Sequence, residues 1–574
     1  MKPSLPVQHR LCWLYALLMT AVLFAFALTF TNVQYGTNDD AGIMRAFLGY
    51  ATGTPVSIHI YIHGLLAWPL YWLSCAFPGQ PWFTWVQLWL LALALTVVVK
   101  GVLQLFVHHE KPLWAGVLLA AAFLLTPGLK AVSRLTFTQT AAMLGMAAVM
   151  QMLSVDHSQK NRCVITGMAG ATALLLLSYA LRQQTLLPQL AFCGLVFLFI
   201  VEQNYGLGKH ARRNLRPMLF SLLTAAAATV FMLGVRYWEE QQISEYIAWS
   251  NARAALLDYT DLNLISQEAL ASVGWSHETF RLFQKWCFLD SSITTESLLA
   301  LAQSAAVREV SSFEAQLSQL WETLKTLVRQ SRADIAGLCW FAIAGVFVLT
   351  GVLSRRQQNR SLLWFVAAAL SGMTAMLLYL AWGNYLPLRA VMVVIFPAAA
   401  ILFAVLPACG STKNRVFVPL CCILCALYAA VSAAASLPQL LPVQDAANPM
   451  ADLEEYALWE PENLFIHDHS LVGRDVDAFP DYSEGVPHNV TGWGGWEMRS
   501  PQSIKQFANF GVDLLQFEPE ILLREDVFIA SKRSDGPLSQ LVNWVKAELG
   551  PDVECEFWAE NGSIYIYHFV DNGA

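Results

Sequence analysis

Apolar segments long enough to cross a membrane recur along this chain, and they restrict its fold more than any other feature. A helix that crosses a bilayer needs about 17–25 mostly apolar residues. Twelve segments approach that length: 11–31, 58–77, 83–107, 113–129, 136–154, 163–181, 186–202, 217–237, 336–353, 361–382, 390–408 and 416–436. Only 13% of the residues are charged, whereas a soluble protein carries about 25%. The sequence predicts a polytopic α-helical membrane protein with about 12–13 transmembrane helices.

Basic residues near short loops favour the cytoplasmic side and so indicate the orientation of these segments. Basic clusters at 209–216, 355–360 and 413–415 agree with one another if all are cytoplasmic. We therefore expect a multi-pass cell-membrane protein with an extracytoplasmic C-terminal part. Lys2, His9 and Arg10, which precede the first apolar segment, indicate a cytoplasmic N-terminus. Three spans after the N-terminus would, however, put the basic loop 108–111 outside. One segment between 32 and 107 must therefore be missing, split or re-entrant.

The pattern of polar segments predicts two domains. Residues 1–437 form the transmembrane domain, with a first outer loop at 32–57 and an outer helical insertion at 238–335. Residues 438–574 form a small extracytoplasmic α/β domain, because short apolar runs alternate there with helical spacing. In the C-terminal part we expect strands at 464–468, 527–530 and 563–569 and helices at 500–510 and 538–549. Helices of the insertion are expected at 242–259, 278–287 and 313–329.

Several function classes are disfavoured by what the sequence lacks. It contains no Walker loop, no HExxH and no GxSxG motif, so an ATP-driven pump and the common soluble hydrolases do not fit. The formal net charge is −7 and there is no long basic run, which excludes nucleic acid as an expected partner.

An acidic pair, Asp39-Asp40, directly follows the first apolar segment. Carboxylates are costly near hydrocarbon, so a pair held at a membrane boundary indicates a functional site. A structural role competes with this interpretation. Asn38 can cap a helix over 39–50, and acidic residues in a first helical turn are favoured by the helix dipole. Both roles stay open, and the residues give no basis for choosing between the two aspartates.

Four basic residues fall at the expected outer ends of spans, where the topology rule disfavours them: Lys130, Arg134, Arg182 and Arg389. Arginine suits bidentate recognition of phosphate, so these residues are candidates for binding a lipid phosphate. The alternative is that each extends its charged group into the membrane interface.

Two histidines, His59 and His63, stand four residues apart and are expected on one face of a helix. That spacing can bind zinc, but no third ligand is visible, and we expect them to line a polar cavity instead. The same substrate cavity is expected to include Arg45, Gln183, Asn384 and Tyr385. The segment from Trp493 to Trp496 could stack on a sugar or form a structured turn.

The chain resembles the GT-C glycosyltransferase superfamily, which includes protein O-mannosyltransferases, aminoarabinose transferases and oligosaccharyltransferases. The resemblance lies in the first-loop acidic pair, the juxtamembrane helix, the many spans and the outer C-terminal domain. The segments Asn38-Asp39-Asp40, Leu135 to Ala141, Leu181-Arg182-Gln183 and Gly492 to Trp496 resemble those of a poorly characterised bacterial branch. The chain lacks the WWD-type motif of oligosaccharyltransferases, which argues against recognition of a peptide sequon.

The resemblance implies a transferase that takes a sugar from a polyprenyl-phosphate donor in the lipid bilayer. The acceptor would be an extracytoplasmic glycan, lipid or protein. Asp39 or Asp40 would act as general base or would ligate a divalent cation, Mg²⁺ or Mn²⁺. Lys130, Arg134, Arg182 and Arg389 would bind the carrier phosphate. Alternative functions are a transporter or flippase of lipid-linked saccharides and a non-catalytic protein of envelope glycan assembly.

Overall fold

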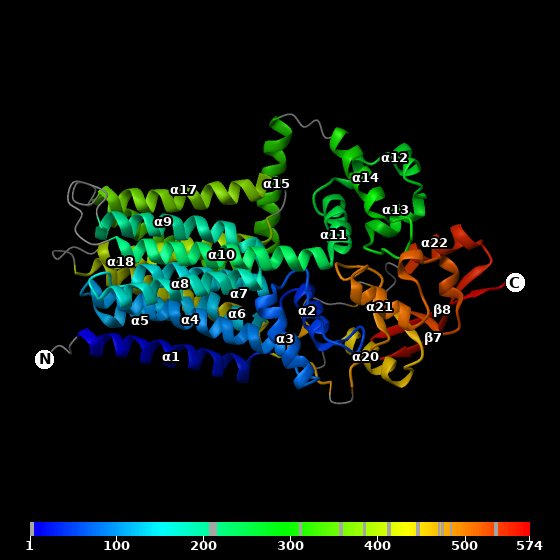
Figure 1. Ribbon diagram of the computed structural model, residues 1–574, viewed down its shortest axis with the longest axis horizontal. Helices are drawn as coiled ribbons and strands as arrows, with labels where there is room; N and C mark the ends of the chain where they lie inside the picture. Colours follow the sequence, from blue (N-terminus) through cyan, green and yellow to red (C-terminus); the bar gives the residue numbers. More distant parts are fainter. Residues whose placement is uncertain are drawn as a thin grey trace.

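The computed structural model describes residues 5–205, 215–308, 313–354, 360–382, 386–409, 415–442, 448–468, 471, 476–482, 485–532 and 538–573. Long helices lie side by side as a bundle, and an extramembrane part caps one end of it (Figure 1). The start of α1 and the end of the last strand lie at opposite ends of the molecule. The bundle helices are α1 (Leu5–Phe30), α4 (Trp82–His108), α5 (Leu113–Phe123) continued by α6 (Leu129–Ser133), α7 (Phe137–Ser154), α8 (Asn161–Leu181), α9 (Leu186–Tyr205), α10 (Arg216–Gln242), α16 (Arg332–Ser354), α17 (Arg360–Trp382), α18 (Leu388–Cys409) and α19 (Phe417–Ser436).

The polytopic helical fold predicted from the sequence is confirmed. Within the described ranges, ten helices are long and apolar enough to cross a membrane. The further bundle helix, α7, has 18 residues and is almost entirely buried between α4, α8 and α18. Its Thr, Gln and Gly residues lower its hydropathy. A helix surrounded by protein does not need an apolar outer face.

The predicted span at 58–77 is wrong. Residues 57–63 form an irregular segment, and α3 (Gly64–Ala76) has 13 residues. At about 1.5 Å per residue this helix is about 20 Å long, short of the roughly 30 Å of a bilayer core. It lies next to α2 (Asn38–Leu48) at the capped end of the bundle (Figure 1). Without this crossing, the loop 108–111 falls at the same end as the start of α1, which removes the inconsistency in the sequence-based topology.

The C-terminal part contains a five-stranded sheet in the order β5-β3-β6-β8-β7. Its strands are β3 (Leu464–His467), β5 (Val490–Gly492), β6 (Val527–Lys532), β7 (Val553–Asn561) and β8 (Ile564–Asp571). β3 pairs in parallel with β5 and β6, and β8 is antiparallel to β6 and β7. The flanking helices are α20 (Pro449–Trp459), α21 (Pro501–Asn509) and α22 (Leu538–Leu549). The three predicted strands and two predicted helices are confirmed, whereas the edge strands β5 and β7 were not predicted.

The helical insertion shares a hydrophobic core with the C-terminal sheet. It contains α11 (Ser244–Leu257), α12 (Gln267–Ser272), α13 (His277–Gln284), α14 (Thr295–Arg308) and α15 (Phe313–Gln330). Trp249 and Phe288 from the insertion belong to the same buried cluster as Trp493 and Trp544. The Phe288 N–H donates to the Trp493 carbonyl oxygen at 2.8 Å. Two segments joined by this bond between residues 288 and 493 therefore form one extramembrane unit.

A small three-stranded sheet connects this unit to the bundle. β1 (Gln34–Tyr35) pairs in parallel with β2 (Arg134–Leu135) and antiparallel with β4 (Val476–Asp477). β1 immediately precedes α2, and β2 immediately precedes α7. The acidic pair is therefore fixed to the start of α7 and to the C-terminal part at the same time.

A substitution at Gly494 can test the contact between the insertion and the C-terminal sheet. A Cβ added there would lie 1.5 Å from the Trp286 carbonyl oxygen, so Gly494→Ala must push the two segments apart. We predict a clearly lower melting temperature for the purified protein in lipid nanodiscs. Gly372→Ala is the matched control, because Gly372 lies in α17 with nothing within 4 Å of an added Cβ, and alanine is the better helix former. Equal melting temperatures for Gly494→Ala and wild type would refute the contact.

Candidate functional site

The helix α2 carries both aspartates in its first turn, where the helix dipole favours acidic side chains. It ends at Gly49, whose φ of 79° lies in the left-handed region that glycine adopts without strain. The expected cap at Asn38 is wrong: Thr37 occupies the N-cap position with extended backbone and makes no side-chain bond to the helix backbone. The Thr37 hydroxyl is directed to Asp40 instead, at 2.6 Å.

Asp40 is fully buried and bonded on several sides. Besides the Thr37 hydroxyl, its carboxyl accepts from the Phe137 backbone N–H at 2.7 Å and from the Gln87 amide at 3.3 Å. These donors belong to α7 and α4, so Asp40 joins α2 to two bundle helices. Burial raises the pKa of Asp40 to about 7. Asp40 is therefore an anchor for α2 and does not line the large cavity described below.

Asp39 points the other way. Its Oδ2 atom forms an ion pair with Nη1 of Arg389 at 2.9 Å, and both side chains are partly exposed. Arg389 lies at the start of α18, 350 residues further along the chain. The sequence left a structural and a functional role open for both aspartates. In the structure Asp40 holds the helix in place, and Asp39 faces open space.

That space is a cavity of about 700 Å³, enclosed by all three parts of the molecule. Asn38 and Asp39 line it from α2, and Arg389 lines it from α18. The insertion contributes Arg253, and the loop after β5 contributes Trp496. The charged lining residues are Asp39, Glu240 and Asp258 together with Arg182, Arg236, Arg253 and Arg389. The cavity is thus polar and has an excess of arginine.

Arg236 connects the irregular segment 57–63 to the end of α10. Its guanidinium donates to the carbonyl oxygens of His59 at 3.0 Å and Ile60 at 2.7 Å, and it pairs with Glu240 at 2.9 Å. With its amide oxygen turned toward Arg236, Gln183 also accepts from Nε at 2.8 Å. The donor groups of this arginine are therefore used within the protein, and its role is to shape the cavity wall.

Arg182 and Arg253 lie against aromatic rings at the cavity wall. The Arg182 guanidinium lies 5.1 Å from the ring centre of Tyr61 and 4.8 Å from that of Phe137. Arg253 lies 5.3 Å from the ring centre of Trp286 and is 5% exposed. Its Nε and Nη1 atoms are buried and lack a hydrogen-bond partner among the described residues. Buried unsatisfied donors are unfavourable, so Arg253 is the arginine best suited to gain a ligand.

The other predicted phosphate-binding residues lie elsewhere. Lys130 forms an ion pair with Asp334. Arg134 donates to the carbonyl oxygens of Asn32 at 3.0 Å and Gln439 at 2.9 Å. Of the four basic residues that the sequence singled out, the structure therefore brings Arg182 and Arg389 to Asp39, whereas Lys130 and Arg134 contact other segments.

The residues predicted for a substrate cavity are also divided. Arg45 pairs with Glu454 of the C-terminal part at 3.0 Å, and with His59 it lines a second, smaller cavity. His63 bonds the Met232 carbonyl oxygen at 2.9 Å and accepts from the Leu65 N–H as the N-cap of α3. Gln183 lines the large cavity, and Asn384 and Tyr385 lie outside the described residues. The predicted helical pairing of His59 with His63 is wrong, because 57–63 is not helical.

The donor set at Asp39 does not fit a resident divalent cation. Mg²⁺ requires near-octahedral oxygen ligation, but an oxygen of Asp39 already pairs with Arg389. In the part of the chain that the structure describes, no group of three or more His, Cys, Asp or Glu side chains could hold a metal ion. The Mg²⁺ or Mn²⁺ considered from the sequence stays an untested prediction.

Arg236, Glu240, Arg253 and Asp258 line the large cavity but were not predicted. They belong to the end of α10 and to the insertion, which the sequence indicated only as a helical cover. Arg253 lies in the run Asn-Ala-Arg-Ala-Ala-Leu-Leu. A single charged residue in such an amphipathic helix is typical of the face that contacts solvent. When a charged side chain is buried by residues from elsewhere in the chain, the sequence around it does not indicate the burial.

No family model and no curated protein matches the chain. Two crystal structures of ArnT from Cupriavidus metallidurans align with nearly its whole length. The structure in the apo state covers 97% of this chain and 97% of its own, with 13% identity and a TM-score of 0.40. The structure bound to undecaprenyl phosphate covers 96% of this chain and 97% of its own, with 12% identity and a TM-score of 0.34.

The raised pKa of Asp40 gives a prediction about stability. Its pKa is about 7 in the folded chain and near its ordinary value of 3.8 when unfolded. Between these values the folded state holds a proton that the unfolded state has released, so this contribution falls as pH rises from about 4 to 7. Asp40→Asn keeps acceptor and donor atoms at the site and should flatten the pH dependence of the melting temperature in this range. Asp39→Asn, the matched control, should keep the wild-type slope, and an unchanged slope in Asp40→Asn would contradict the assignment.

Proposed function

We propose that this protein is a membrane glycosyltransferase that transfers a sugar from a polyprenyl-phosphate donor to an acceptor hydroxyl. The observation that carries the proposal is the Asp39 carboxylate at the edge of a cavity of about 700 Å³ that four arginines line. A carboxylate can accept a proton from an acceptor hydroxyl, and arginines can hold a phosphate. The resemblance of the acidic first loop to the GT-C superfamily supports the same chemistry.

The proposed orientation puts the cavity outside the cell. Basic residues lie in or next to the connections α4–α5, α7–α8, α16–α17 and α18–α19: Lys111, Lys160, Arg162, Arg360 and Arg415. These connections lie at the end of the bundle opposite the extramembrane part (Figure 1). Cytoplasmic loops are rich in such residues. The acceptor in this proposal is therefore an extracytoplasmic glycan, lipid or protein, and the lipid-linked donor is used where nucleotide sugars are absent.

In the proposed reaction, Asp39 takes the proton of the acceptor hydroxyl while that oxygen attacks the anomeric carbon of the donor sugar. The new glycosidic bond forms as the bond from the anomeric carbon to the phosphate oxygen breaks. The electron pair leaves with the polyprenyl phosphate, and the proton stays on Asp39 until it passes to solvent. The ion pair with Arg389 holds the carboxylate of Asp39 in one orientation.

Arg253 and Arg182 are the proposed ligands of the leaving phosphate. Charge develops on the phosphate oxygen as the bond breaks, and fixed cations at that point lower the barrier. Both arginines are held against aromatic rings, so little side-chain freedom is lost when a phosphate binds. The carrier would be a polyprenyl phosphate of the undecaprenyl class, the lipid held by one of the two ArnT structures.

Binding of the carrier can be measured without knowing the sugar. We predict that undecaprenyl phosphate, but not undecaprenol, raises the melting temperature of the full chain in nanodiscs. Arg253→Gln should weaken this binding by at least about tenfold, since hydrogen bonds to charged groups are the strong ones. Lys130→Gln is the control, because Lys130 pairs with Asp334 outside the cavity. Loss of binding in Lys130→Gln but not in Arg253→Gln would contradict this assignment and place the phosphate beside Lys130 instead.

Transfer itself is the test of Asp39. In proteoliposomes with a panel of undecaprenyl-phosphate sugars and an envelope extract as acceptor, wild type should form labelled product. Asp39→Asn should lower the rate by about 10²–10⁴-fold, the usual contribution of a general base, while still binding undecaprenyl phosphate. Undiminished transfer in Asp39→Asn would refute the role of Asp39. Movement of the donor across the membrane without any product would instead favour a flippase.

A further inference from the structure

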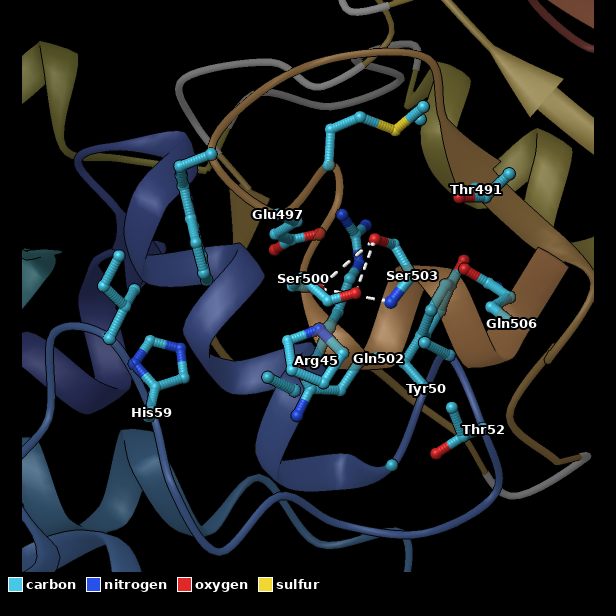
Figure 2. A pocket seen from close by; sticks show the side chains of 18 of the residues that line it. Arg45, Tyr50, Thr52, His59, Thr491, Glu497, Ser500, Gln502, Ser503 and Gln506 are labelled. Atoms are coloured by element: carbon cyan, nitrogen blue, oxygen red, sulfur yellow. Dashed lines mark hydrogen bonds between the residues drawn. The ribbon is translucent and has the colours of Figure 1, made fainter. Parts of the chain in front are cut away.

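A second cavity lies next to the first, between α2 and the C-terminal part (Figure 2). Its volume of about 90 Å³ equals that of about three water molecules in the liquid. Trp496 and Ile60 line both cavities, so the two share a wall. The smaller cavity thus opens beside the place where Asp39 would act.

Two parts of the chain supply polar groups to this second cavity. Arg45 and His59 line it from α2 and from the segment before α3. Glu497, Ser500 and Ser503 line it from the C-terminal part. In Figure 2 these side chains surround one space, with the N-terminal segments in blue and the C-terminal segments in orange-brown. Neither part forms the cavity alone.

Two of these side chains have buried donors that the protein does not satisfy. Nη2 of Arg45 donates to Glu454, but its Nε atom is buried and lacks a hydrogen-bond partner among the described residues. His59 accepts from the Tyr61 N–H through Nδ1 at 3.1 Å, and burial lowers its pKa to about 3. The neutral ring therefore carries its hydrogen on Nε2, which is also buried and unsatisfied.

Glu497 supplies the opposite kind of group. Its side chain is exposed in the cavity, and no hydrogen bond to its carboxylate occurs within the described ranges. The absence of a side chain at Gly42 lets this carboxylate lie against α2, because an added Cβ would be 2.0 Å from Oε1 of Glu497. A carboxylate beside unsatisfied N–H donors accommodates a ligand that both donates and accepts.

We propose that this second cavity binds the hydroxyl-bearing edge of a single sugar residue. Each sugar hydroxyl donates one hydrogen bond and accepts others, which matches Glu497 on one side and Arg45 with His59 on the other. The indole of Trp496 offers an apolar surface for the ring face. A phosphate would be repelled by Glu497, and an apolar ligand would leave the buried donors unsatisfied. That this sugar is the acceptor rests on the proposed function.

The test measures saccharide binding to the full chain in nanodiscs by saturation-transfer-difference NMR. The probes are the methyl glycosides of glucose, mannose, galactose and N-acetylglucosamine. At least one should bind wild type, and Glu497→Gln should weaken it by about tenfold, since hydrogen bonds to ions are the stronger ones. His59→Phe keeps the ring contacts with Phe47 and Trp496 but removes Nε2, and should weaken binding as well. Glu548→Gln is the matched control, because Glu548 is exposed on α22 and lines neither cavity, and it should bind like wild type.

Three results would overturn the proposal. They are no signal with any probe on wild type, loss of the signal in Glu548→Gln but not in Glu497→Gln, and equal loss in both. Undecaprenyl phosphate binding, measured on the same preparations, verifies that each variant is folded. If wild type bound the saccharide but not undecaprenyl phosphate, the proposed function would fail while the saccharide site would stand.

Discussion

The buried carboxyl of Asp40 is the interaction on which the candidate site depends. It holds the first turn of α2 against the start of α7 through the Phe137 N–H and against α4 through Gln87. With Asp40 fixed inward, the neighbouring residue on the helix must face another direction. Asp39 is therefore presented to the cavity at a defined position, where Arg389 pairs with it. A buried carboxyl that accepts several hydrogen bonds is a rigid support.

The candidate site also depends on the core that the insertion shares with the C-terminal sheet. It brings Trp249 and Phe288 together with Trp493 and Trp544, and it closes the cavity from above the bundle. Arg253 lies on the inner side of this cover, against Trp286. The membrane helices alone would leave Asp39 and Arg389 in an open depression. The extramembrane unit adds Arg253, Asp258 and Trp496 to the lining and so turns that depression into a deeper polar cavity.

Much of the fold was predictable because its signals are local. Membrane-length apolar runs predicted the bundle, and β3, β6 and β8 were visible as short apolar strands. The exception at 58–77 has a physical reason: the apolar composition of α3, with Leu65, Trp68 and Trp72 on its exposed face, suits a short helix at the bundle end as well as a span. Length and composition cannot separate these cases, whereas the positions of the basic loops showed that the number of spans predicted in this region was inconsistent.

The site was only partly predictable, because its residues depend on distant contacts. Asp39, Arg182 and Arg389 stood out as charges near membrane boundaries. Nothing local distinguished Asp39 from Asp40, since their environments are set by Phe137 and Arg389, 97 and 350 residues away. Lys130 and Arg134 have the same sequence signature as Arg182, yet bond to Asp334 and to main-chain carbonyls. Arg253 resembled a solvated helix residue, but in the folded chain it is buried and packs against Trp286 of the insertion.

The central claim is that the cavity beside Asp39 holds the phosphate of a polyprenyl carrier. The most direct measurement is a cryo-electron microscopy structure of the full chain in nanodiscs with undecaprenyl phosphate. The account predicts phosphate density in the large cavity, within hydrogen-bonding distance of Arg253. Phosphate density beside Lys130, with the large cavity occupied by water alone, would contradict it.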